Sequence, residues 1–181
     1  MKKELIISGF GGQGVMSVGK SLVEAGMAEG LHVTWAPSYG PEIRGGTANC
    51  SVVLSDHPVG SPTFIHPTEV IAMNLPSLLK FEPLVQSGGL IFVNSSFVTE
   101  TVTRDDVRAI YVPCGEIADQ LGNPKVANMV MLGAYVAATK SLHPETIRHM
   151  ITELFTGKKA KLVDLNFKAL DAGMACVNTN L

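Results

Sequence analysis

A glycine-rich turn near the amino terminus is the part of this sequence best suited to chemistry. Residues 9–14, with the sequence GFGGQG, satisfy the pattern G-x-G-x-x-G between a short apolar run and an amphipathic segment. Glycine permits a left-handed backbone and the close approach of a ligand, and a helix that begins at such a turn offers unpaired N–H groups to a phosphate. Lys20, one to two turns further on, is placed to neutralise a second phosphate. The predicted cofactor-binding residues are Gly9, Gly11, Gly12, Gln13, Gly14 and Lys20.

The same turn has two other interpretations. The glycines could simply allow a tight connection from strand to helix. A dinucleotide site is the second alternative, and it needs an acidic residue about 20 residues beyond the glycines to hold the ribose hydroxyls. The second predicted strand ends at Pro37 here, and no Asp or Glu follows until Glu42. A nicotinamide-dependent dehydrogenase is therefore disfavoured.

A second polar segment, residues 38–50, follows the carboxyl end of the second predicted strand, where ligands and partners of open α/β sheets bind. Glu42 and Arg44 within it could pair with each other, or Arg44 could hold a carboxylate or phosphate with two hydrogen bonds. Both interpretations stay open at this point. The residues predicted to contact substrate or a partner subunit are Tyr39, Glu42, Arg44, Gly45, Gly46 and Asn49.

Alternating strands and helices must position these two segments. The pattern predicts a strand at 5–8, a helix at 15–29 and a strand at 32–36, with the two strands parallel. Residues 37–46 are predicted to form a loop. Further strands are expected at 47–54, 70–73, 89–94 and 109–112, and helices at 75–85, 114–121, 128–140, 143–155 and 166–175. The fold class is α/β, a single three-layer Rossmann-like domain of residues 1–181 with a mostly parallel sheet and helices on both faces.

Composition excludes several classes of function. The chain is 46% hydrophobic and only 17% charged, with a net charge of -2, and a low charge content is typical of a surface partly covered by a partner. The sequence has no wide basic face for nucleic acid, no apolar run long enough to span a membrane, and no signal peptide at its start, so a cytoplasmic protein is expected. The five histidines have no metal-ligand spacing, so no metal site is predicted. Three separate cysteines, predicted to be buried thiols, cannot hold an iron–sulfur cluster by themselves; they are Cys50, Cys114 and Cys176.

Three segments together resemble the gamma subunit of the pyruvate, 2-oxoglutarate and ketoisovalerate ferredoxin oxidoreductases. They are residues 9–15 (GFGGQGV), 39–50 (YGPEIRGGTANC) and 123–134 (NPKVANMVMLGA). The resemblance spans nearly the whole chain. It implies a multi-subunit enzyme that converts a 2-oxoacid, coenzyme A and oxidised ferredoxin into acyl-CoA, carbon dioxide and reduced ferredoxin. Among substrates, 2-oxoglutarate is slightly favoured, followed by pyruvate or a branched-chain 2-oxoacid.

The resemblance also implies where the cofactors lie. Thiamine diphosphate and Mg are expected between alpha and beta subunits, and iron–sulfur clusters in the beta subunit or in a ferredoxin-like delta subunit where one is present. Those subunits would be the partners of this chain, and ferredoxin would be reached through the complex. The sequence agrees, because it has neither a thiamine-diphosphate motif of the G-D-G…N type nor cluster spacing of its cysteines.

The sequence leaves two alternative roles for this chain within such a complex. In the first, which we predict, the glycine turn and Lys20 bind the phosphates of coenzyme A while the second segment reaches toward the shared active site. In the second, the subunit is purely structural. No residue is assigned a catalytic role, although Glu42 or Arg44 could position a reactant. The alternatives are the small subunit of indolepyruvate ferredoxin oxidoreductase and a stand-alone Rossmann-type nucleotide-binding enzyme.

Overall fold

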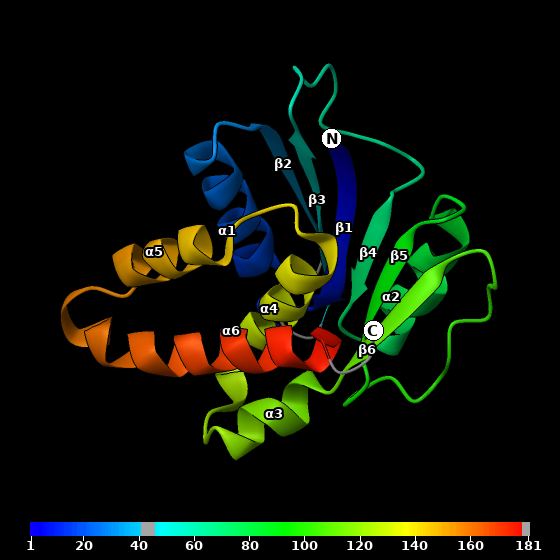
Figure 1. The fold of residues 1–181 in the computed structure, drawn as a ribbon. Coiled ribbons are helices and arrows are strands. Elements are labelled where there is room, and N and C mark those ends of the chain that lie inside the picture. Colours follow the sequence, from blue (N-terminus) through cyan, green and yellow to red (C-terminus); the bar gives the residue numbers. More distant parts are fainter. Residues whose placement is uncertain (41–45, 179–181) are drawn as a thin grey trace.

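A six-stranded sheet of order β2-β3-β1-β4-β5-β6 forms the centre of the computed structural model, which describes residues 1–40 and 46–178 (Figure 1). Strand β3 is antiparallel to both of its neighbours, and β1, β4, β5 and β6 pair in parallel. The predicted mostly parallel sheet is confirmed, with β3 as its single reversed strand in the described residues. The strands are β1 (Lys2–Phe10), β2 (His32–Tyr39), β3 (Thr47–Ser55), β4 (Glu69–Ala72), β5 (Leu90–Asn94) and β6 (Arg108–Val112).

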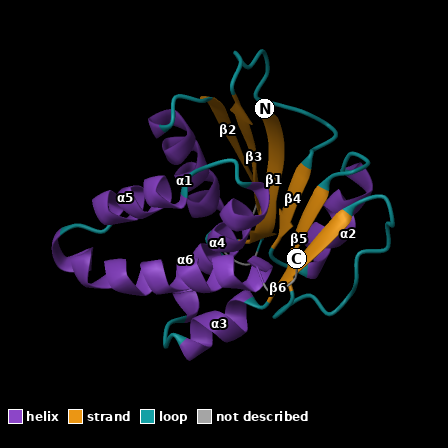
Figure 2. Cartoon of the chain, in the orientation of Figure 1, coloured by secondary structure: helices purple, strands orange, loops and turns teal. Residues whose placement is uncertain are grey.

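Helices cover both faces of the sheet, which confirms the three-layer architecture (Figure 2). Helices α1, α4, α5 and α6 lie on one face with α3 beside them, and α2 packs on the other face against β1 and β4. The helices are α1 (Val15–Ala28), α2 (Leu75–Phe81), α3 (Cys114–Gln120), α4 (Ala127–Thr139), α5 (Pro144–Leu154) and α6 (Val163–Asn178). Three short 3₁₀ segments join them: η1 (Glu82–Leu84), η2 (Pro124–Val126) and η3 (Gly157–Leu162). None of the described helices combines the length and apolar character that a membrane crossing requires.

Strands β1 and β2 run in the same direction, as predicted, but β3 lies between them and pairs with both. This insertion places β2 at the edge of the sheet. The prediction that residues 37–46 form a loop was wrong at its start, because β2 continues to Tyr39 and Pro37 pairs with Cys50. Proline lacks the N–H that an inner strand needs, so it is tolerated here because β2 is an edge strand.

The larger part of the hydrophobic core lies between the sheet and helices α1, α4, α5 and α6. Helix α4 is apolar almost all round and is buried from Met129 to Val136. Its Gly133 and the Gly173 of α6 allow the two helices to touch through their backbones. A Cβ at Gly133 would lie 2.0 Å from the Leu170 carbonyl oxygen, so only glycine fits at this crossing.

A buried polar group ties this core to the amino end of the parallel strands. Glu69 on β4 is 1% exposed, and its Oε1 lies 2.7 Å from Nζ of Lys3. The hydroxyl of the fully buried Tyr135 donates a 2.7 Å hydrogen bond to Oε2 of Glu69. A buried carboxylate requires such partners, so these residues fix how α4 sits on the sheet.

The three cysteines differ in their surroundings. Cys50 and Cys114 are buried as predicted, whereas Cys176 is partly exposed, so its expected full burial was wrong. Burial raises the pKa of the Cys50 thiol to about 11, and burial also raises the pKa of Cys114. These two thiols stay neutral at physiological pH and are therefore poor nucleophiles.

Candidate functional site

The glycine turn joins β1 to α1, and backbone conformation or close packing requires glycine at most of its glycine positions. Gly12 and Gly14 have φ of 97° and 76°, a left-handed region that favours glycine, and Gly14 is the N-cap of α1. A Cβ at Gly9 would lie 2.6 Å from Oε1 of Gln13, and one at Gly14 would lie 2.5 Å from Nδ2 of Asn128. Gly12 is different, because a Cβ there would meet no atom of the described residues within 4 Å. No described residue therefore covers the backbone at Gly12.

The amino end of α1 is uncapped by described residues. The N–H of Val18 donates to the Gly14 carbonyl and is the first N–H bonded within the helix. No side chain of a described residue caps the helix, and its first turn contains no acidic residue. The N–H groups of Val15, Met16 and Ser17 therefore have no acceptor in the described chain, and the partial positive charge of the helix end is not compensated locally.

Val15, Met16 and Ser17 are among the residues that line a cavity of about 370 Å³, which we call the glycine-turn cavity. The second predicted segment comes to the same place, because β3 pairs with β1 and brings Thr47 opposite Phe10. The N–H of Gly11 donates a 3.0 Å hydrogen bond to the carbonyl oxygen of Gly46, which joins the two segments directly. The cavity is lined by Phe10, Gly11, Gly12, Gly14, Val15, Met16, Ser17, Tyr39, Thr47 and Ala48.

Two of the predicted binding residues instead hold the turn in place. Gln13 accepts a 2.7 Å hydrogen bond from the N–H of Phe10 through its Oε1, and its Nε2 donates to the carbonyl oxygen of Met73 at 3.1 Å. These bonds fix the turn against the residue that follows β4. Gly9 is packed against Gln13 and Met73 and does not line the cavity. Gln13 and Gly9 thus fix the conformation of the turn without lining the glycine-turn cavity.

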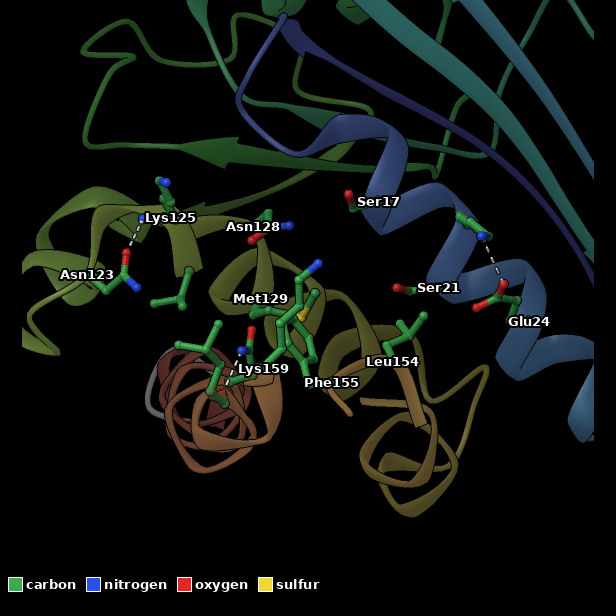
Figure 3. A pocket seen from close by; sticks show the side chains of 14 residues that line it. Ser17, Ser21, Glu24, Asn123, Lys125, Asn128, Met129, Leu154, Phe155 and Lys159 are labelled. Carbon is green, nitrogen blue, oxygen red and sulfur yellow. Dashed lines mark hydrogen bonds and ion pairs between the residues drawn. The ribbon is translucent and has the colours of Figure 1, made fainter. Parts of the chain in front are cut away.

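Lys20 faces a different, larger cavity of about 420 Å³. There its Nζ lies 3.5 Å from Oε1 of Glu24, one helical turn further along α1. Figure 3 shows this second cavity, with Ser17 and Ser21 of α1 across from Asn128. Lys20 does not line the glycine-turn cavity, and Ser17 is the residue common to both.

The remaining predicted residues of the second segment have varied positions. Tyr39 lines the glycine-turn cavity and is 62% exposed. Asn49 pairs with Ser8 and Ser38 within the sheet and does not line that cavity. Glu42, Arg44 and Gly45 lie outside the described residues.

Sequence reasoning did not single out Met16, Ser17, Thr47 or Ala48. Met16 and Ser17 occupy the second and third positions of a helix that follows a glycine turn, and this position was the signal available for them. Thr47 and Ala48 become neighbours of the turn only through pairing of β3 with β1, which no local pattern reveals. No group of three potential metal ligands occurs among the described residues.

The fold and this site define the class: a single α/β domain with a ligand-sized cavity at a strand–turn–helix unit. The family model for pyruvate ferredoxin/flavodoxin oxidoreductase matches residues 4–176. The chain belongs to this family, which confirms the resemblance recognised in the sequence.

Similar proteins agree with this assignment. The chain is 43% identical over 176 residues to the ketoisovalerate oxidoreductase subunit VorA of Methanothermobacter thermautotrophicus; the match covers 97% of this chain and 36% of that protein. The chain therefore spans about a third of the length of this relative. The crystal structure of the gamma subunit of a keto/oxoacid ferredoxin oxidoreductase from Geobacter sulfurreducens has a TM-score of 0.83 at 27% identity, covering 98% of this chain and 99% of that one.

A second solved structure shares the fold at lower identity. It is the 2-oxoglutarate:ferredoxin oxidoreductase from Magnetococcus marinus with 2-oxoglutarate, coenzyme A and succinyl-CoA bound. Its TM-score is 0.88 at 22% identity, and the match covers 98% of this chain and 31% of that one. In both solved proteins the matching region has the fold of the domain described above.

Proposed function

We propose that this chain is the gamma subunit of a complex that carries out the coenzyme A-dependent oxidative decarboxylation of a 2-oxoacid with reduction of ferredoxin. Within that complex, the glycine-turn cavity binds the pyrophosphate of coenzyme A. The observation that carries this proposal is the amino end of α1, which no described residue caps and whose first residues line a cavity together with Gly12.

The chemistry of the cavity suits an anion. Backbone N–H groups at a helix end and the helix dipole together favour a phosphate. No Asp or Glu is among the described residues that line the cavity, so none of these lining side chains repels an anion. A nicotinamide dinucleotide is disfavoured by the sequence, because its ribose hydroxyls need an acidic partner near the end of the second strand and β2 itself contains no Asp or Glu.

Coenzyme A is the anion that the family context favours. The Magnetococcus enzyme, which shares this fold, was solved with coenzyme A and succinyl-CoA bound. In the proposed reaction the 2-oxoacid loses carbon dioxide, two electrons pass to ferredoxin, and the acyl group is transferred to the thiol of coenzyme A. The role of this chain is to hold the phosphate end, so that the thiol end reaches an active site in partner subunits. Holding the cofactor in this way lowers the entropy cost of the acyl transfer.

The other cofactors of such a complex do not fit this chain. An iron–sulfur cluster needs thiolate ligands close together, whereas the described residues contain no cluster of three potential ligands and two of the three cysteines are buried. We therefore propose that thiamine diphosphate, Mg and the clusters are held by alpha, beta or delta partners. This chain contributes binding of coenzyme A and assembly of the complex.

A purely structural subunit is the competing function, and two observations favour it. Packing alone explains the glycines at positions 9 and 14, and Gln13 uses its side chain to fix the turn. Neither observation explains why no described residue caps α1. The two functions therefore differ in one respect, which is whether the free N–H groups of Met16 and Ser17 receive an anion.

Replacement of Ser17 by aspartate tests this difference. Ser17 is exposed, and a carboxylate in the first turn of a helix stabilises the helix by about 0.3–1 kcal/mol. The same carboxylate repels a phosphate at the helix end. Calorimetric titration of the full chain with coenzyme A is expected to show at least about tenfold weaker binding for Ser17→Asp, which corresponds to roughly 1.4 kcal/mol.

The matched control is Ser17→Asn, because asparagine has the same shape as aspartate but carries no charge. This variant is expected to bind coenzyme A within about threefold of the unmodified chain, or roughly 0.7 kcal/mol. Equal affinity of the Asp and Asn variants would refute a phosphate at this helix end. Binding of coenzyme A by the complex but not by the full chain alone, with an affinity that Ser17→Asp leaves unchanged, would support the structural function.

The substrate is tested on the assembled complex. Affinity capture of this chain from its native lysate, with mass spectrometry of the partners, is expected to recover alpha and beta subunits. Reduction of ferredoxin by that complex is then compared for 2-oxoglutarate, pyruvate and 2-oxoisovalerate. The sequence predicts 2-oxoglutarate first, while the 43% identity to a ketoisovalerate oxidoreductase subunit makes the branched-chain 2-oxoacid the main competitor. Recovery of the chain without such partners would contradict the proposed complex.

A further inference from the structure

Two aromatic side chains lie exposed along the outer edge of the sheet, where β2 packs beside α1 (Figure 1). Trp35 points to the face of the sheet that carries α1, because a Cβ at Gly19 of this helix would lie 3.0 Å from its Nε1. Side chains alternate between the two faces of a strand, so Pro37 and Tyr39 point to the same face. Trp35 is 37% exposed and Tyr39 is 62% exposed. The edge of the sheet therefore presents large apolar groups to its surroundings.

Helix α1 continues this apolar surface. Met16, Val23 and Met27 lie along one side of the helix, at spacings of seven and four residues. Val23 follows Gly19 by one turn, so this side of the helix borders β2. Met16 and Val23 are partly buried against the core, whereas Met27 is 64% exposed. We call the combined surface the α1–β2 patch, and it consists of Met16, Val23, Met27, Trp35, Pro37 and Tyr39.

The surroundings of the patch carry little charge. Strand β2 contains no Asp, Glu, Lys or Arg. Lys20 lies on the same side of α1, but its Nζ is 3.5 Å from Oε1 of Glu24 and it lines the second cavity. Aromatic and methionine side chains without charges are enriched at the centres of protein interfaces, and a contiguous exposed apolar surface marks an interaction site. The α1–β2 patch is therefore suited to a protein partner with an apolar surface.

The backbone of β2 is not suited to the addition of a further strand. The N–H of Gly40 donates a 2.8 Å hydrogen bond to the carbonyl oxygen of Thr47 on β3. Residues of antiparallel strands alternate between bonding inward and outward, so the nitrogen of Pro37 lies on the outer side of β2. Proline has no N–H, and an added strand would lose a hydrogen bond in the middle of this edge. A partner therefore meets the side chains of the patch rather than the backbone of β2.

The patch extends to the rim of the glycine-turn cavity. Met16 and Tyr39 belong to the patch and also line that cavity. Met27 follows Met16 by 11 residues, which is about 16 Å along the axis of α1, and it does not line the cavity. A partner seated on the patch thus borders the cavity at one end. The proposed function requires such a neighbour, because the thiol end of coenzyme A must reach an active site outside this chain.

The relatives indicate which partner this is. The match to VorA covers 97% of this chain but 36% of that protein, so in VorA a domain like this one is joined to a longer remainder. A second copy of this chain on the patch would bring another glycine turn, not the active site that the thiol end needs. We propose that the α1–β2 patch docks the partner subunit that corresponds to the remainder of VorA, and that this partner presents an uncharged apolar surface to Trp35 and Met27. This inference rests on the proposed function, since the occupant is chosen by its place beside the coenzyme A site.

Replacement of Met27 by lysine tests the patch. Lysine forms helices as readily as methionine, and a positive charge suits the last turn of α1, which holds no basic residue, so the variant is expected to fold. The dissociation constant is measured between the full chain and the partner subunit recovered with it. Met27→Lys is expected to weaken this association by at least about tenfold, because a charge would be buried in an apolar interface. Coenzyme A affinity of the isolated chain should stay within about twofold, since Met27 lies away from the cavity.

Leu79→Lys is the matched control. Leu79 is 63% exposed, close to the exposure of Met27, and lies on α2 at the opposite face of the sheet. This variant is expected to leave the association unchanged. Added salt is also expected not to weaken the association of the unmodified chain, because screening acts on charges. Equal weakening by the two lysine variants, or unchanged association of Met27→Lys, would overturn the patch as the docking surface.

Trp35 allows a measurement without any substitution. It is the only tryptophan of the sequence, so a chain labelled with fluorotryptophan gives a single fluorine resonance. This resonance is expected to shift when the complex forms with unlabelled partner subunits. An unchanged resonance in the assembled complex would overturn the docking surface. Self-association of the chain that Met27→Lys abolishes would instead place a second copy on the patch and overturn the assignment of the partner.

Failure of this proposal is distinguishable from failure of the proposed function. Ser17→Asp acts on coenzyme A affinity and should leave assembly intact, whereas Met27→Lys acts on assembly and should leave coenzyme A affinity intact. If Met27→Lys assembles normally while Ser17→Asp loses coenzyme A, the patch is wrong and the cavity stands. Recovery of the chain without any partner subunit would overturn both.

Discussion

Replacement of Gly12 by alanine separates the folding role of the glycine turn from its proposed binding role. Gly12 has φ of 97°, and a Cβ there would meet no atom of the described residues within 4 Å. An L-residue in the left-handed region costs about 1–2 kcal/mol. The Gly12→Ala variant should therefore lose about that much free energy of unfolding, with no added cost from a clash.

Gly30 provides the matched control. It lies just beyond α1, has φ of 78°, and its Cβ would also meet nothing within 4 Å. Gly30→Ala should therefore destabilise the chain by a similar amount, about 1–2 kcal/mol. Gly14→Ala should cost more than either, by about 1–3 kcal/mol, because its Cβ would also lie 2.5 Å from Nδ2 of Asn128. Urea unfolding followed by circular dichroism measures these differences.

Binding should distinguish Gly12 from Gly30. A methyl group at Gly12 projects into the glycine-turn cavity, which Gly12 lines, and prevents close approach of a phosphate to the backbone. Calorimetric titration with coenzyme A is expected to show an affinity about tenfold lower or worse for Gly12→Ala, a loss of at least roughly 1.4 kcal/mol. Gly30→Ala should bind normally. The reasoning is refuted if both variants bind alike, since strain rather than the cavity would then decide affinity.

Two further predictions concern the stability of the domain. Tyr135→Phe should lower the free energy of unfolding by about 1–3 kcal/mol, because Glu69 loses a buried donor. The control is Tyr111→Phe, which should cost less, because the Tyr111 hydroxyl only accepts a hydrogen bond from the exposed N–H of Val102. Equal losses of the two variants in urea unfolding would contradict this account. Burial raises the pKa of Cys50 to about 11, so folding favours its neutral thiol. The stability from this group is present below the ordinary thiol pKa and falls, by up to roughly 2–3 kcal/mol, as pH rises from about 9 to about 11. Cys50→Ala should lose less stability than the unmodified chain over that range, and parallel pH curves would count against the burial effect.

Much of the architecture could be predicted from the sequence because it is encoded locally. The apolar run of residues 5–8, the turn and the amphipathic segment starting at Val15 each follow from spacing of apolar residues and glycines. The position of β3 between β1 and β2 could not be predicted in this way. It depends on pairing between distant residues such as Ile7 and Cys50, which no local pattern records.

The site was predicted in part for the same reason. The helix end at Gly14 is a local feature, and the structure leaves it open as the pattern indicates. Lys20 was expected beside the same phosphates, but the wall that it faces is built by η3 and the start of α4, far away in the chain. Gln13 was grouped with the ligand contacts because of its place in the motif, whereas its hydrogen bonds to Phe10 and Met73 depend on tertiary structure.

The backbone N–H groups at the start of α1 test the central claim most directly. Two-dimensional ¹⁵N–¹H spectra of the 19.2 kDa chain are recorded during titration with coenzyme A. If the pyrophosphate binds where we propose, the largest shifts occur at Gly12, Met16 and Ser17, and in the Ser17→Asp variant these shifts require a much higher concentration of coenzyme A. Shifts confined to other parts of the chain, with these three amides unchanged at saturation, would contradict the claim that the glycine-turn cavity holds coenzyme A.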